Sequence, residues 1–191
     1  MKITRIRHVK KTLRFYSVNF QLKEPYHVLC DGTFIAHVVR AHQSLNKILE
    51  AVFTRYKFVP YTVPQVLDEL RKLKLTEALQ TAKKLKLQRP VIPCDTPNDA
   101  ILSLVKEPSL PKGQFYIVAT KDKELLQAVR EIPRAIGLNI YHLNPILDSP
   151  TQIAMEHVKK QQRIAFGATS LTPNAMNVTD TIDSEVQLKE D

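Results

Sequence analysis

Four carboxylates stand at corresponding places in this sequence, each at or just after the end of an apolar segment. Asp31 directly follows YHVLC, and Asp122 comes two residues after FYIVAT. Glu69 lies one turn into the helical segment that starts at Pro64, and Asp99 lies at the start of the next such segment. Like charges that gather closely repel one another, and a divalent cation with oxygen ligands relieves that repulsion. The set therefore indicates a Mg²⁺ or Mn²⁺ site of the kind that activates water and stabilises a phosphate.

Each acid taken alone has a simpler interpretation as a helix cap. Asp31 and Asp122 could cap the helices that follow them, and Asp99 could interact with a helix dipole. Glu69 shares a helical stripe with Val66, so it points partly inward, which is unusual for a glutamate without a partner. Capping stays open for each acid alone, but four acids at four successive strand ends favour a metal-type cluster.

Alternating apolar and amphipathic segments must position these acids. Apolar runs predict strands, and apolar residues at helical spacing predict helices, with Ser44 and Thr96 placed as helix N-caps. The strands are expected at 26–30, 58–63, 90–94, 115–120 and 138–143, and the helices at 8–16, 44–56, 64–74, 76–87, 96–106, 121–132 and 153–165. This alternation predicts an α/β fold with a central parallel sheet flanked by helices on both faces. In such sheets, ligands bind at the carboxyl ends of the strands.

Composition limits the class of protein. The chain has 191 residues, of which 43% are hydrophobic, so it can bury a core. Cys30 and Cys94 are too few for a disulfide framework or a zinc quartet, and Cys30 is expected in the core. The start lacks the apolar region of a signal peptide, and no apolar run is long enough to span a membrane. We therefore expect a reduced, intracellular protein without a membrane partner.

The net charge of +9 is unevenly distributed. Residues 1–27 and 70–89 each carry seven basic side chains against one acid, whereas 173–191 is acidic. A polyanion is the natural partner of basic blocks, although 70–89 could equally be a solvated helix face. For the first block we favour RNA or an acidic protein surface, because the segment has few ways to bury itself. Its aromatic residues Phe15, Tyr16 and Phe20 could stack on bases, but we expect them to anchor the block to the domain or to a partner. The residues expected to bind RNA are Lys2, Arg5, Arg7, Lys10, Lys11, Arg14, Lys121 and Lys123.

The four acidic segments resemble the motifs of the PIN domain, a metal-dependent ribonuclease fold. The resemblance is carried by YHVLCDGTF, QVLDELRKL, NDAILSLV and FYIVATKDKEL, in that order. Thr120 fits the hydroxyl often found in the last motif. The amino-terminal block, including EPY before the first strand and DGTF after it, is similar to PIN proteins of the eukaryotic small-subunit (SSU) processome. The resemblance covers roughly residues 1–160.

The resemblance implies an SSU processome assembly factor in 18S rRNA maturation, located in the nucleolus. Its implied partners are pre-rRNA, a box H/ACA small nucleolar RNA and processome proteins, with no small-molecule substrate. The alternative is an active metal-dependent endoribonuclease that cleaves pre-rRNA. In that case Asp31, Glu69, Asp99 and Asp122 would be the catalytic residues and the Mg or Mn ligands. Glu124 would be an accessory acid, and Lys121 or Lys123 would steady the scissile phosphate.

The sequence departs from the family pattern in three places. The positions that correspond to a family zinc site look like Gln65, Arg89, Val91 and Ala100, so no structural zinc is expected. PRAIGLNI replaces the usual loop before the last strand, and the chain ends in an acidic LKED. The expected organisation is a basic arm (1–24), a PIN-like domain (25–146), a partly helical extension (147–168) and an acidic, disordered tail (169–191).

Overall fold

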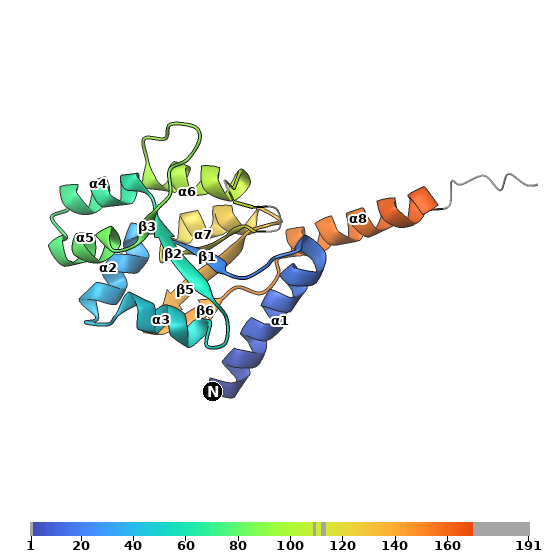
Figure 1. Ribbon diagram of the computed structural model, residues 1–191, viewed down its shortest axis with the longest axis horizontal. Helices are drawn as coiled ribbons and strands as arrows, with labels where there is room; N and C mark the ends of the chain where they lie inside the picture. The colour runs from blue at the N-terminus through green and yellow to red at the C-terminus, as the bar shows by residue number, and fades with distance from the viewer. Residues whose placement is uncertain (1, 109, 112–113, 170–191) are drawn as a thin grey trace, which may run out of the picture.

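The computed structural model describes residues 2–108, 110–111 and 114–169 (Figure 1). The strands are β1 (Tyr26–Cys30), β2 (Phe58–Thr62), β3 (Lys86–Leu87), β4 (Tyr116–Ala119), β5 (Ile136–Tyr141) and β6 (Asn144–Leu147). The helices are α1 (Lys2–Phe20), α2 (Gly32–Arg40), α3 (Leu45–Val52), α4 (Pro64–Lys72), α5 (Thr76–Lys83), α6 (Pro97–Lys106), α7 (Lys123–Arg130) and α8 (Gln152–Thr169).

One six-stranded sheet, ordered β3-β2-β1-β4-β5-β6, forms the centre of the molecule. All neighbouring strands run parallel except β5 and β6. Strands β1 and β4 are buried along their whole length, as expected for central strands covered on both faces. Figure 1 shows α4, α6 and α7 on one side of the sheet and α1 and α3 on the other. The predicted α/β class and mostly parallel sheet are confirmed.

The order of the strands brings two predicted site segments together. Cys30, the last residue of β1, pairs with Ala119, the last residue of β4. The chain leaves both strands at the same edge of the sheet, so Asp31 and Thr120 become neighbours. The order in which strands are added to the sheet switches at this point, because β2 lies on one side of β1 and β4 on the other. Open α/β sheets bind ligands at such a place.

The amino-terminal segment is a packed helix rather than a free arm. Val9, Leu13, Tyr16 and Phe20 recur at helical spacing, and all four are buried in the common core. The Tyr16 hydroxyl also donates a 3.2 Å hydrogen bond to the carbonyl of Ala135. The expectation that this segment has few ways to bury itself is therefore wrong. The expected anchoring role of Tyr16 and Phe20 is confirmed.

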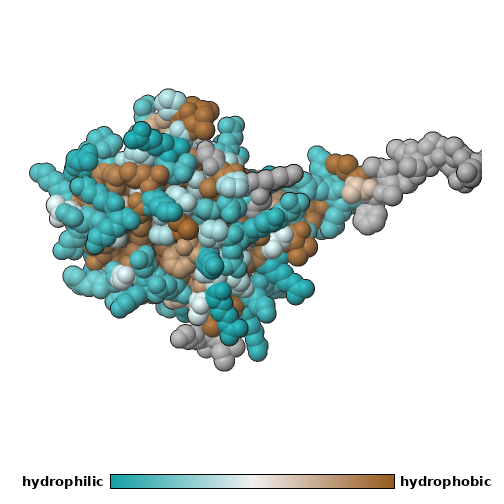
Figure 2. Space-filling view, in the orientation of Figure 1, coloured by the Kyte–Doolittle hydropathy of each residue, from teal (hydrophilic) through white to brown (hydrophobic). Residues whose placement is uncertain are grey.

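The predicted edge strand at 90–94 is also wrong. The sheet instead ends at β3, which pairs only with Tyr61 and Thr62 of β2. Pro60 therefore lies where β2 has no outer neighbour, which is where a strand tolerates proline. The segment after β3 forms an irregular loop in which Val91 and Ile92 are exposed. Figure 2 shows apolar surface at the tip of this loop.

Two further elements were not expected from the sequence. Helix α2 begins immediately after Asp31, and β6 returns antiparallel to β5 through a tight turn.

Helix α8 extends away from the body of the molecule (Figure 1). Its Val158 is buried, and its His157 ring stacks on Phe20 at 5.8 Å between ring centroids. The expected acidic tail, 169–191, lies outside the described residues apart from Thr169. None of the described helices combines the length and the apolar character that crossing a membrane requires.

Candidate functional site

Asp31 is held at the carboxyl end of β1 by hydrogen bonds from residues that directly follow β1 and β4. It is the N-cap of α2 and accepts from the Gly32 and Thr33 backbone N–H groups at 2.6 and 3.3 Å. The hydroxyls of Thr33 and Thr120 donate to its Oδ2, the latter at 2.9 Å. The side chain is only 2% exposed. A carboxylate with four donors around it is strongly fixed in position.

Asp122 stands beside this network at the start of α7. Its Oδ1 accepts from the Glu124 N–H at 2.9 Å and so caps the helix. Its Oδ2 accepts from the Asn98 side-chain amide at 3.1 Å. Its own backbone N–H donates to Thr120 Oγ1 at 3.0 Å, so the threonine hydroxyl joins Asp31 to Asp122. The capping interpretation is confirmed for both aspartates, but each carboxylate oxygen has more than one lone pair and can accept further ligands.

Glu69 reaches the same place from α4. Its Oε2 lies 3.2 Å from the point where a Cβ on Gly32 would be, so the glycine leaves room for the carboxylate. The pKa of Glu69 is raised, first by burial and then by the negative charges of Asp31 and Asp122. Among the described residues, none of these three acids forms an ion pair. The prediction that Glu69 points partly inward is therefore confirmed.

Asp99 lies apart from the other three acids. It is exposed, and its carboxylate accepts a hydrogen bond from the Thr96 hydroxyl at 2.6 Å. Its backbone N–H donates to Thr96 Oγ1 at 3.1 Å. This reciprocal bonding caps α6. Asn98, the preceding residue, reaches the site instead. The structure thus brings Asp31, Glu69 and Asp122 together and leaves Asp99 outside.

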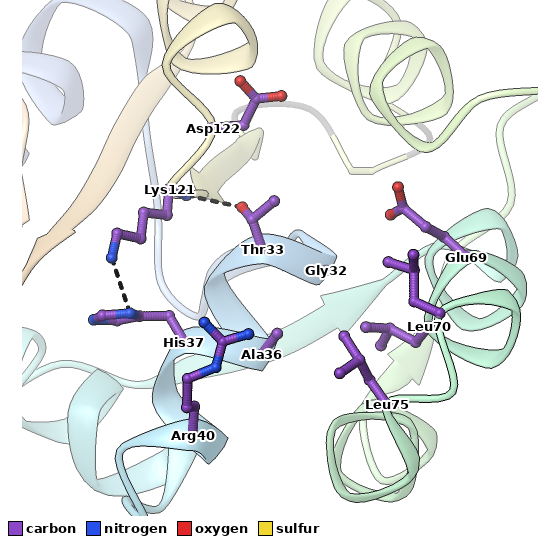
Figure 3. Close-up of a pocket in the computed structure, with 11 residues that line it drawn as sticks. Gly32, Thr33, Ala36, His37, Arg40, Glu69, Leu70, Leu75, Lys121 and Asp122 are labelled. Carbon is purple, nitrogen blue, oxygen red and sulfur yellow. Dashed lines mark hydrogen bonds between the residues drawn. The ribbon is translucent and has the colours of Figure 1, made fainter.

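A pocket of about 470 Å³ opens between these acids and a cationic wall. Lys121 extends along α2, with its N–H bonded to Thr33 Oγ1 at 3.1 Å and its ammonium 2.9 Å from His37 Nδ1. Figure 3 shows Glu69 on the opposite side of the pocket from this lysine. Lys123 and Glu124 are exposed at the start of α7 and do not line the pocket. The lining residues are Gly32, Thr33, Ala36, His37, Arg40, Glu69, Leu70, Leu73, Leu75, Lys121 and Asp122.

The donor chemistry of this pocket fits Mg²⁺ or Mn²⁺, which prefer carboxylate and water oxygens. The pKa of Glu69 is raised by burial and then by the negative charges of Asp31 and Asp122, and within the described residues no ion pair balances these carboxylates. Within the described residues, no three His, Cys, Asp or Glu side chains converge closely enough to hold an ion on their own. Mg²⁺ needs only one or two carboxylates, because it keeps several of its waters. A largely hydrated ion is therefore the form that this arrangement suits.

Sequence reasoning missed four residues of the site: Thr33, His37, Arg40 and Asn98. The first three lie on α2, which was not expected, so their 33, 37, 40 spacing on one helical face was not considered. Asn98 directly precedes Asp99, and only the helix geometry decides which of the two faces Asp122. Of the residues expected to bind RNA, Arg5 is tied to Asn144 Oδ1 at 3.0 Å, and the Lys2 side chain lies outside the described part of the chain.

Comparisons with known proteins place this chain among rRNA-processing relatives and PIN-domain structures. Residues 54–149 match the Fcf1 family. The mouse rRNA-processing protein FCF1 homolog is 31% identical over 137 residues, which cover 68% of this chain and 63% of the mouse protein. The Schizosaccharomyces pombe rRNA-processing protein fcf1 is 32% identical over 127 residues, or 62% of this chain and 61% of that protein. The chain thus aligns with about three fifths of the length of these relatives.

A solved structure, that of the PIN domain endonuclease Utp24, superposes with a TM-score of 0.56 at 28% identity. The match covers 68% of this chain and 96% of that one. The central, mostly parallel sheet flanked by helices is therefore that of a PIN-like fold. Within that class, the chain belongs to the Fcf1 family.

Proposed function

We propose that this protein acts in 18S rRNA maturation as an SSU processome assembly factor that binds pre-rRNA. The observation that carries the proposal is the basic outer face of α1. Its apolar face is fixed in the core, whereas Arg7, Lys10, Lys11 and Arg14 are exposed, and residues 1–23 contain no acid. A rigid row of unpaired basic side chains suits a phosphate backbone better than a flexible arm does, because less order is lost on binding.

Membership of the Fcf1 family supports the same process, since the relatives are named as rRNA-processing proteins. We propose a nuclear, and more specifically nucleolar, location and processome proteins as partners. Within the family, the amino-terminal block points to the subgroup of U three protein twenty-three. That finer assignment carries with it the proposal of a box H/ACA small nucleolar RNA as a second RNA partner. We expect no structural zinc in this protein.

The second candidate function is a metal-dependent endoribonuclease acting on pre-rRNA. It is favoured by the pocket that Glu69 and Asp122 line, with Asp31 buried beside it, because none of these three acids forms an ion pair among the described side chains. A Mg²⁺ or Mn²⁺ ion bound there would supply a hydroxide nucleophile and stabilise charge on the phosphate. Asp122 and Glu69 would hold the ion, with Asp31 fixed behind them. Asp99 is proposed as the weakest contributor, because it caps α6.

Around that ion the chain's own residues would orient the RNA. Lys121 lies on the pocket wall opposite Glu69, with its ammonium at His37, where it can bind a phosphate oxygen. Lys123, at the first turn of α7, would contact an adjacent phosphate. The Thr120 hydroxyl would keep Asp31 and Asp122 at a fixed spacing.

A depletion and rescue experiment tests both functions. Cells depleted of the protein should accumulate unprocessed 18S precursors, and the wild-type chain should restore processing. Rescue by Asp122→Asn would assign the protein as an assembly factor, whereas failure of a stably expressed Asp122→Asn chain would favour the endoribonuclease. Normal 18S maturation after depletion would contradict both.

A further inference from the structure

His37 lines the pocket wall, and neither candidate function uses it. It lies on α2 one turn after Thr33, and both residues contact Lys121. The Thr33 hydroxyl oxygen accepts from the Lys121 backbone N–H, and His37 Nδ1 contacts the ammonium at the far end of the lysine side chain. Lys121 is therefore held at both ends along one face of α2 (Figure 3).

The bonding partners of His37 define its tautomer. Its Nε2 contacts the carbonyl oxygen of His142, at the turn between β5 and β6. A carbonyl can only accept, so Nε2 carries the proton. Nδ1 is then an unprotonated acceptor, and it takes a hydrogen bond from the Lys121 ammonium at 2.9 Å. With this bonding the imidazole is neutral, and a backbone carbonyl of the β5–β6 turn orients its ring.

The position of Lys121 is the opposite of what charge alone would favour. Asp122 is the next residue, and Glu69 stands across the pocket with its pKa raised by burial and by the neighbouring carboxylates. A lysine on a flexible stem next to unpaired acids would normally form an ion pair with them. Within the described residues it forms none, and its ammonium meets a neutral ring instead.

We propose that His37 is a positioning residue that holds the Lys121 ammonium off the carboxylates and so keeps the pocket open to a divalent cation. The proposal rests on the metal site put forward under the endoribonuclease function. Without His37, Lys121 swings onto Glu69 and Asp122 and competes with the metal for the same oxygens. With His37, the same ammonium stays on the opposite wall, where an anion such as a phosphate group would lie.

Mn²⁺ binding by calorimetry on four proteins tests this arrangement. The proteins are the wild type, His37→Ala, Lys121→Ala and the double variant, each checked for folding by its Tm. We expect His37→Ala to weaken Mn²⁺ binding about tenfold, the scale of one nearby charge. The double variant should bind at least as well as the wild type, because the competing ammonium is gone. A purely structural loss at His37 would not be restored by removing Lys121.

The other outcomes separate the two proposals. Equal affinity of His37→Ala and the wild type, or a double variant as weak as His37→Ala, would overturn the role of His37 alone. Binding by Lys121→Ala but not by the wild type would also overturn it, because Lys121 would already occupy the site. Absence of binding in all four would remove the metal site itself, and the positioning role with it. His37→Gln, whose amide can accept from Lys121 and donate to His142, should bind Mn²⁺ more tightly than His37→Ala.

Discussion

The Thr120 hydroxyl donates a 2.9 Å hydrogen bond to Asp31 Oδ2 and joins the carboxyl ends of β4 and β1. Both residues are almost completely buried. The Thr120 Oγ1 in turn accepts from the Asp122 N–H at 3.0 Å, so one hydroxyl links the two acids that follow neighbouring strands. The relative positions of these two carboxylates thus depend on a neutral side chain.

Replacing Thr120 by valine tests this link. The substitution keeps the shape but removes a donor from a buried carboxylate, which should lower the free energy of unfolding by about 1–3 kcal/mol. For a chain of this size, each kcal/mol lowers Tm by about 2–4 °C. Thr120→Ser keeps the hydroxyl and is the matched control. Equal thermal stability of the two variants would show that the hydroxyl does not support Asp31.

Glu69→Gln should stabilise the fold while removing a proposed metal ligand. The raised pKa of Glu69 means that the folded state binds its proton more tightly than the unfolded state does. Stability contributed by this group is therefore lost as pH rises from its ordinary pKa through its folded pKa. The Tm advantage of Glu69→Gln should be absent at low pH and grow across that window.

Thermal unfolding of both proteins over a pH series measures this advantage. Asp68→Asn, on the exposed face of the same helix, is the control and should show no such growth. A Tm difference for Glu69→Gln that stays constant with pH would contradict the electrostatic origin.

Helix α1 should be essential to stability, in contrast to a detachable arm. Leu13 is 2% exposed in the core, so Leu13→Ala should lower the free energy of unfolding by about 2–5 kcal/mol. Val18, on the same helix, is 71% exposed, and Val18→Ala should change it by no more than about 0.5 kcal/mol. Urea unfolding would measure both. A small effect of Leu13→Ala would mean that α1 is not docked in solution.

The exposed basic face of α1 should govern binding to single-stranded RNA. Lys10→Gln combined with Lys11→Gln should weaken binding and reduce the slope of log K against log salt by about 1.4, or 0.7 for each phosphate contact. Lys83→Gln with Lys84→Gln removes the same charge from the other basic block. Fluorescence anisotropy with one oligonucleotide at several salt concentrations compares the two. Equal losses would attribute binding to net charge rather than to α1.

The sequence was sufficient where a local pattern and the global fold agree. YHVLC and FYIVAT are short, continuous apolar runs of the kind that buried parallel strands carry, so β1, β4 and the carboxylates after them could be predicted. The inward tilt of Glu69 followed from its helical stripe with Val66.

Other features depend on contacts between distant segments. Helix α1 has many basic residues, which favoured a solvated arm. Its apolar stripe is buried only because Tyr16 packs on the folded core and bonds to Ala135. Asp99 and Asn98 are adjacent in sequence, and the angle of α6 decides which one faces Asp122. The carbonyl that turns His37 comes from His142, 105 residues away, which no local pattern connects to α2.

The most direct measurement is Mn²⁺ binding by calorimetry to the wild type, Asp122→Asn and Asp68→Asn, with RNA cleavage followed in the same buffer. Asp68 lies outside the pocket and pairs with Arg71 at 2.7 Å, so its variant controls for loss of a carboxylate. The account predicts that the wild type and Asp68→Asn bind Mn²⁺ and that Asp122→Asn does not. Mn²⁺-dependent cleavage by the same two proteins would add the endoribonuclease activity. Absence of binding to the wild type, or undiminished binding to Asp122→Asn, would contradict a metal site at the ends of β1 and β4.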